Sequence, residues 1–122
     1  MFDALRNLDD WKRACRLSVD VLTLVEGCGN RAYKDQLGRS SLSVASNLAE
    51  GYAREGSKEH IRFLVIAKSS CTECWTQLLI GAEAGMVDRG AALSLATEAE
   101  ELAAMIVGLI RFFQKRADSP AP

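Results

Sequence analysis

Residues 58–84, KEHIRFLVIAKSSCTECWTQLLIGAEA, contain no proline and carry apolar side chains on two sides of a helical pattern. The first apolar stripe consists of Ile61, Leu64, Cys71, Trp75, Leu78 and Ala82. The second consists of Phe63, Ile66, Ala67, Cys74 and Gly81. Apolar residues that recur every three and four positions are typical of a helix that buries one face. This segment therefore predicts a long helix with more apolar surface than one neighbouring helix covers.

Three further segments show the same helical periodicity, and they run from Asp9 or Asp10 to Glu26, from 31 to 54 and from 89 to 116. The only prolines of the chain lie at positions 120 and 122, so no proline interrupts these segments. Short connections between long helices place successive helices antiparallel. We therefore predict an all-α, up-and-down antiparallel four-helix bundle over residues 1–117, followed by a disordered tail at 118–122.

Local signals set the expected ends of these helices. Asp9 or Asp10 is expected to cap the first helix, because an aspartate side chain accepts hydrogen bonds from first-turn amides. Gly27-Cys28-Gly29-Asn30 is expected to end that helix, since glycine and asparagine tolerate the backbone that follows a last turn. Ser57 is expected to cap the helix over 58–84.

The expected apolar faces of the other helices complete the bundle. The first helix presents Trp11, Ala14, Ser18, Val21, Leu22 and Val25, and the last presents Leu93, Ala96, Ala99, Leu102, Ala103, Ile106, Leu109, Ile110 and Phe113. The helix over 31–54 combines an apolar stripe with small residues, and these are Gly38, Ala45, Ala49 and Ala53. Apolar surface beyond the needs of one bundle predicts a homo-oligomer.

Charge and composition fit one ordinary globular domain. The 122 residues are 48% apolar and 25% charged, with a formal net charge of -1, which argues against a generally basic nucleic-acid binder. Residues 31–68 contain seven basic and four acidic residues, so this stretch has a local net positive charge. The chain shows neither a signal-peptide pattern nor an apolar run of about 18 residues. A cytoplasmic protein with no membrane partner is therefore expected.

The cysteine and histidine content argues against a metal site, a cofactor and an enzyme. Cys71 and Cys74 have CxxC spacing, but a structural zinc site takes four ligands and no second CxxC is present. The four cysteines are instead expected to be small core thiols. His60 is the only histidine, whereas a di-iron bundle site needs two Glu-x-x-His pairs. No nucleophile is patterned near His60, and no glycine-rich phosphate loop follows a strand.

One polar stripe exceeds ordinary bundle patterning. It consists of Arg39, Ser43, Asn47, Glu50 and Arg54, which at 100° per residue fall within a wedge of about 80°. Ser40, Ser41 and Ser46 add hydroxyl groups nearby. We call the five residues the polar stripe and take them as the candidate binding or assembly site.

The polar stripe has two interpretations. In the structural one, Asn47 pairs with Glu50 and Glu50 pairs with Arg54 along the helix. Glu50 would then also be able to accept a bidentate bond from an arginine of a neighbouring subunit. In the other interpretation, the arginines contact phosphate groups and Asn47 contacts a base or a sugar.

The segment QLGRSSLSVASNLAEGYAR, residues 36–54, also resembles a family signature. It is similar to the pattern Q-L-R-R-A-A-x-S-I-P-S-N-I-A-E-G-x-x-R of the 23S ribosomal RNA intervening-sequence proteins, a bacterial family of four-helix bundles. Further matches occur at 57–59, at 66–70 and in Leu8-x-x-Trp11-x-x-Ala14, so the resemblance spans about residues 8–113.

Three departures from the family pattern change what the resemblance implies. Ala45 stands where proline is common, so the helix is expected to be less kinked. Gly38 replaces a common arginine, which removes a positive charge beside the polar stripe. Gly27-Cys28-Gly29 stands where Phe-Pro usually precedes this helix.

The resemblance implies an assembly rather than a reaction. Some relatives are encoded inside insertions of 23S ribosomal RNA genes. Their fold resembles the accessory variability protein of diversity-generating retroelements, a pentameric ring thought to bind nucleic acid and a reverse transcriptase. The expected protein is therefore a ring-like homopentamer of unassigned function that associates with RNA or with a nucleic-acid-processing protein. The alternative is a structural or protein-interaction scaffold with no nucleic-acid role.

Overall fold

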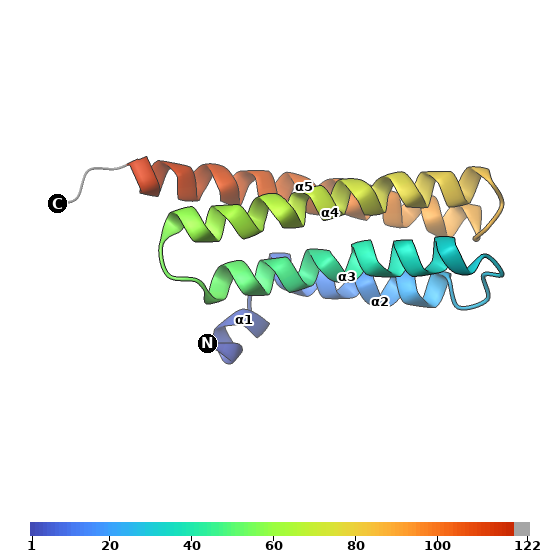
Figure 1. Ribbon diagram of the computed structural model, residues 1–122, viewed down its shortest axis with the longest axis horizontal. Helices are drawn as coiled ribbons and strands as arrows, with labels where there is room; N and C mark the ends of the chain where they lie inside the picture. The colour runs from blue at the N-terminus through green and yellow to red at the C-terminus, as the bar shows by residue number, and fades with distance from the viewer. Residues whose placement is uncertain (119–122) are drawn as a thin grey trace.

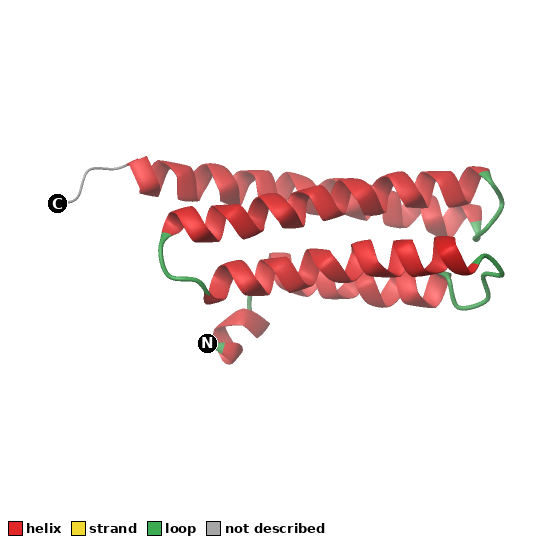
Figure 2. Ribbon diagram, in the orientation of Figure 1, coloured by secondary structure: helices red, strands yellow, loops and turns green. Residues whose placement is uncertain are grey.

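The computed structural model describes residues 1–118, which form five helices and no strands (Figures 1 and 2). The helices are α1 (Phe2–Arg6), α2 (Asp9–Leu24), α3 (Arg31–Ala53), α4 (Ser57–Glu83) and α5 (Arg89–Asp118). The expected all-α class is confirmed. The one helix that the periodicity did not predict is α1, whose five residues are too few to show a repeat.

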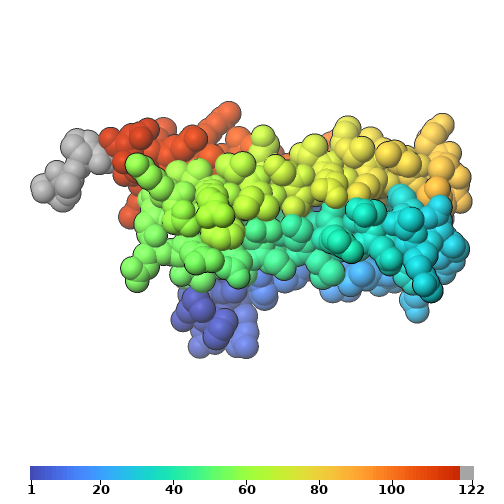
Figure 3. Space-filling view, in the orientation of Figure 1, coloured from blue at the N-terminus to red at the C-terminus, as the bar shows by residue number. Residues whose placement is uncertain are grey.

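The four long helices run side by side and alternate in direction, with short loops at the two ends of the bundle (Figure 1). α4 packs against α3 and α5, and α2 completes the bundle by packing against the other sides of α3 and α5. α1 projects from the side of the bundle, near the start of α2 (Figure 3). It is anchored there by one buried side chain, Leu5.

The helix starts correct two of the expectations and add one cap that was not predicted. Leu8 occupies the N-cap position of α2, so neither Asp9 nor Asp10 caps it; both lie in the first turn, where a negative charge still favours the helix dipole. Gly56 occupies the N-cap of α4 and Ser57 is the first helical residue. Gly56 takes this position because its φ of 86° is open to glycine and strained for other residues. Asn30 caps α3, because its side chain accepts a hydrogen bond of 3.0 Å from the Tyr33 amide.

The C-terminal end differs by one residue from the expected boundary. α5 continues through Asp118, which is the first residue of the expected tail. The basic residues Lys115 and Arg116 lie in its last turn, where they favour the helix dipole. Residues 119–122, also expected to belong to a disordered tail, lie outside the described residues.

The core takes side chains from all four long helices. Its largest fully buried members include Leu17 of α2, Leu37 of α3, Leu78 of α4 and Ile106 of α5. Three residues that were placed in the apolar stripes are more exposed than expected: Leu22 is 46% exposed, and Ile66 and Leu93 are each 38% exposed. Each lies at an edge of its stripe, and the bundle covers only the middle of each helical face.

Across residues 1–118, no helix combines enough length with enough hydropathy to span a membrane.

The buried thiols of α4 give a first testable prediction. Burial raises the pKa of Cys71 from 9.0 to about 12 and that of Cys74 to about 11, because the thiolate loses its hydration there. At a given pH, Cys71 then holds about a thousandfold less thiolate than an ordinary thiol, and only the thiolate reacts. Iodoacetamide at pH 8, followed by peptide mass spectrometry, should modify the partly exposed Cys28 first and leave both α4 thiols unmodified.

The control for this labelling is the same reaction in denaturing urea, where all four cysteines should react. Modification of Cys71 in the folded protein at the rate of Cys28 would contradict the closed core, because both burial and thiolate depletion would then be absent.

Candidate functional site

A line of hydrogen bonds that we call the α3–α4 seam joins α3 to α4, and Ser43 is the member of the polar stripe that bonds across it. Ser43 and Ser70 bring their hydroxyl oxygens to 2.7 Å across it. Ser40 donates to the side-chain oxygen of Gln77 at 2.7 Å. The Tyr33 hydroxyl donates to the backbone carbonyl of Gln77 at 2.7 Å. Burial raises the pKa of Tyr33, so the phenol keeps the proton that it donates.

Asn47 turns its amide back along α3. Its Nδ2 donates to the Ser43 carbonyl at 2.8 Å and to the Ser43 hydroxyl at 3.0 Å. The expected pairing of Asn47 with Glu50 is therefore wrong, because the amide reaches the preceding turn instead. A donor that already makes two hydrogen bonds inside the chain has little left to offer a base or a sugar.

Glu50 and Arg54 form the pair that their four-residue spacing predicted. Arg54 Nη2 donates to Glu50 Oε2 at 3.1 Å. The guanidinium of Arg54 also lies 4.9 Å from the centre of the Phe63 ring, within the range of a cation–π contact. Both side chains of the pair are about half exposed, so the ion pair contributes little to stability on its own.

Arg39 is the member of the polar stripe that remains open. It is exposed and, among residues 1–118, forms no ion pair. It lies on the outer side of α3, at the rim of a groove between α2 and α3. The structure thus divides the polar stripe into three parts. Ser43 bonds across the seam, and Asn47 bonds back to Ser43. Glu50 and Arg54 pair with each other, and Arg39 points to solvent.

The α2–α3 groove has a volume of about 420 Å³ and was not predicted from the sequence. Its apolar lining includes Leu22 and Val25 from α2 and Leu42 from α3. Gly38 lies between these helices with the Leu22 side chain 3.5 Å from the position a Cβ would take. Lys34 and Arg39 supply cationic side chains at the groove, and Glu26 and Asp35 supply anionic ones.

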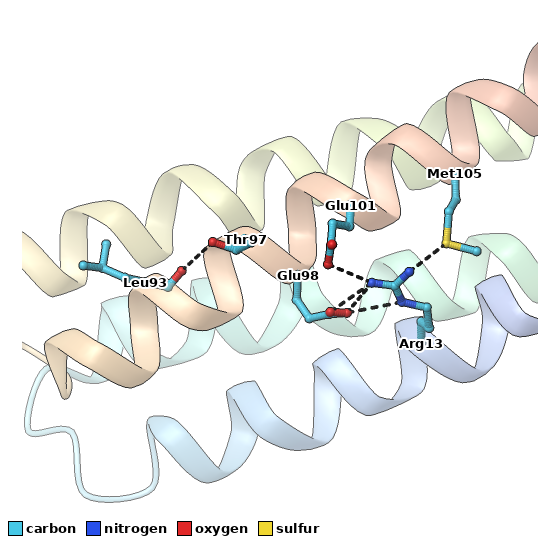
Figure 4. A network of polar contacts seen from close by, with 6 residues as sticks. All are labelled: Arg13, Leu93, Thr97, Glu98, Glu101 and Met105. Carbon is cyan, nitrogen blue, oxygen red and sulfur yellow. Dashed lines mark hydrogen bonds and ion pairs between the residues drawn. The ribbon is translucent and has the colours of Figure 1, made fainter.

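A second polar network, also missed by sequence reasoning, ties α2 to α5 (Figure 4). Arg13 donates to both carboxylate oxygens of Glu98 and, at 3.0 Å, to Glu101. Its Nη1 also lies 3.2 Å from the sulfur of Met105. The hydrogen bond to Glu98 raises the pKa of Arg13 above its usual value. The only sequence signal for this network was the three-residue spacing of the two glutamates, which many exposed helices share.

The fold defines an all-α helical-bundle protein. Most of the polar side chains described above form hydrogen bonds or ion pairs with other groups of the same chain. The model of the family described as 23S rRNA-intervening sequence protein matches residues 6–108. The chain belongs to this family, and the resemblance of residues 36–54 is confirmed.

A solved structure agrees with this assignment. It is a crystal structure of a protein with unknown function from the S23 ribosomal protein family of Bacteroides thetaiotaomicron VPI-5482. The two chains superpose with a TM-score of 0.76 at 18% sequence identity, and the match covers 83% of this chain and 97% of the other. At this identity the likeness shows a shared fold. No curated protein sequence matches the chain.

Proposed function

We propose that this protein is a non-enzymatic, cytoplasmic assembly module that self-associates through the α2–α3 groove. The observation that carries the proposal is the apolar surface around the groove. Leu22 and Leu42 line the groove from two adjacent helices and are each about half exposed, as is Val19, which lies three residues before Leu22 on α2. Contiguous apolar surface of this kind marks a protein–protein contact, because leaving it in water costs free energy.

The occupant of the groove would be a second copy of the chain. The outer face of α4 offers a complementary strip, in which Ile66 and Ile80 are exposed with Glu73 between them at seven-residue spacing. Leu22 and Leu42 would pack on the two isoleucines. Arg39, at the rim of the groove, would pair with Glu73, which accepts a 3.4 Å hydrogen bond from Gln77.

A contact between two different faces of the same chain is heterologous, so it propagates into a closed ring or an open filament. A closed ring agrees with the homopentamer that the family resemblance implies. A ring of this kind would serve as a scaffold that displays its outer surface to a protein partner.

Replacing Leu22 or Leu42 with glutamate tests this proposal. A carboxylate buried against Ile66 and Ile80 loses its hydration without gaining a partner, so each variant should weaken self-association at least about tenfold. Light scattering coupled to gel filtration should give the wild type a multiple of the 13.3 kDa chain mass, five for a pentamer, and the variants the mass of one chain.

Thr97→Glu provides the matched control, because it adds the same charge at an exposed position of α5. It should keep the wild-type mass. A wild type that is monomeric over the whole concentration series would overturn the proposal, and so would Leu22 and Leu42 variants of unchanged mass.

A second candidate function, binding of RNA, rests on the open cations of the groove. Arg39 and Lys34 are exposed, and among the described residues neither forms an ion pair. Affinity for structured RNA should be measured over a salt series, because released counterions give phosphate contacts a steep salt dependence. Arg39→Gln should lower the slope by about one if Arg39 contacts phosphate. If the intact oligomer shows no affinity for RNA at low salt, RNA binding is excluded and the protein scaffold remains as the function.

A further inference from the structure

All four long helices meet at the end of the bundle that contains the α3–α4 loop (Figure 1), and two adjoining pockets lie there. The inner pocket, which we call the chamber, has a volume of about 130 Å³. The outer pocket, which we call the mouth, has a volume of about 260 Å³. His60 and Phe113 line both, and their ring centres lie 4.1 Å apart. The two rings therefore form a wall that the chamber and the mouth share.

The chamber is mainly apolar. Leu8, Leu48 and Leu109 line it together with the shared ring pair, and its polar groups are the Asp10 carboxylate and the Tyr52 hydroxyl. Burial lowers the pKa of His60, with Asp10 acting in the opposite sense, so the histidine side of the wall carries little charge at neutral pH. A compact apolar body with the volume of one six-membered ring would fill a space of this size.

The mouth has the opposite character. Arg54 reaches it from the end of α3, Ser57 from the first turn of α4, and Arg116 from the last turns of α5. Arg54 gives one hydrogen bond to Glu50, which leaves most of its five donors unused. Two guanidinium groups from separate helices can hold the oxygens of a phosphate with charge-assisted hydrogen bonds.

The position of the shared wall depends on Gly51. A Cβ at that position would lie 2.9 Å from His60 Cδ2 and 3.3 Å from the His60 backbone oxygen. The missing side chain lets α3 and α4 approach closely enough to place His60 at the border of both pockets. The site is thus built by side chains from four helices, and the uncapped start of α4 only adds backbone amides to it.

We propose that this end of the bundle binds a small phosphate monoester whose apolar body occupies the chamber and whose phosphate group occupies the mouth. The proposal goes beyond assembly and is independent of it, since none of the groove residues lines either pocket. The chemistry that recognises the ligand is a dianion joined directly to a compact ring. Such a ligand places its ring in the chamber and its phosphate group in the mouth, whereas a ring alone or a phosphate alone occupies only one of the two pockets.

Phenyl phosphate is the probe, and inorganic phosphate and phenol are its two halves. Isothermal titration of the full chain should give one site per chain, with phenyl phosphate binding at least about tenfold more tightly than inorganic phosphate, because the ring leaves water for the chamber. Phenol should bind more weakly still. Benzoate, which offers a monoanion on the same ring, should bind more weakly than phenyl phosphate because it carries less charge for the two arginines.

Arg116→Gln should weaken phenyl phosphate about tenfold or more through the loss of charge-assisted hydrogen bonds. Arg111→Gln is the matched control, because it removes the same charge from an exposed position of α5 outside both pockets. It should change the affinity by less than about twofold, the scale of a screened surface charge. Circular dichroism melting of both variants verifies that the fold is kept.

Amide NMR signals provide a readout that does not depend on any variant. Phenyl phosphate should shift the signals of Ser57 and His60 and leave Lys34, at the opposite end of α3, unchanged. Equal affinities for phenyl phosphate and inorganic phosphate would overturn the proposal. So would equal losses in the two arginine variants, or no signal shifts with millimolar probe.

Discussion

Leu78→Ala is expected to lower the free energy of unfolding by about 2–5 kcal/mol, which is a large part of the stability of a domain of this size. Leu78 is completely buried, at 0% exposure, in the last third of α4. The substitution removes apolar atoms that are out of water and leaves a cavity that the surrounding helices fill only in part. Urea unfolding followed by circular dichroism gives the change from the shift of the midpoint at constant slope.

Val65→Ala on the same helix is the matched control, because Val65 is 46% exposed and lies outside the proposed contact with a second copy. It should cost less than a third of the Leu78 change when the two are compared in the same oligomeric state. Equal losses at the two positions would contradict the arrangement of α4, since they would mean that both faces of the helix are equally buried.

Gly81→Ala is expected to destabilise the protein by about 2–3 kcal/mol, although alanine is the better helix former by about 1 kcal/mol. A Cβ at position 81 would overlap the Tyr33 hydroxyl and would lie 2.4 Å from Cζ of the same ring. Tyr33 would have to leave the α3–α4 seam and give up its 2.7 Å hydrogen bond to the Gln77 carbonyl. The same urea titration measures the loss.

Two companion variants separate the overlap from the effect of the backbone. Gly108→Ala on α5 meets no atom within 4 Å and should stabilise the protein by up to about 1 kcal/mol through helix propensity alone. In a Tyr33→Ala background, Gly81→Ala should lose its penalty. A penalty that persists without the Tyr33 ring would show that the ring is not what requires glycine at position 81.

The polar stripe shows how far helical spacing carries a prediction. The pairing of Glu50 with Arg54 follows from their four-residue separation and is present. The partner of Ser43 lies on another helix, at Ser70, and no spacing within α3 could name it. Asn47 had neighbours within reach in both directions, and the geometry of its turn selected Ser43. Of the two local pairs that spacing predicted, only Glu50–Arg54 forms, and the pair across the seam was not predictable at all.

The N-caps show a similar limit. Aspartate and serine both favour the cap position, so the sequence offered Asp9 or Asp10 as the cap of α2 and Ser57 as the cap of α4. Neither prediction holds, whereas Asn30 before α3 and Asp88 before α5 do act as caps, because their side chains accept hydrogen bonds from the amides of Tyr33 and Ala91. Before α4, Gly56 at a φ of 86° takes the cap position and moves Ser57 into the first turn.

The sequence by itself determined the class, the four long helices and the family, because each of these is encoded in local spacing or in a contiguous segment such as residues 36–54. Only the tertiary structure decided which edges of the apolar stripes stay in water, as Leu22 does. It also decided that Arg13 joins Glu98, and that His60 and Phe113 form one wall at the end of the bundle. These contacts depend on how each helix is rotated about its axis and shifted along it relative to the others. Both quantities are set by the packing of all four helices together.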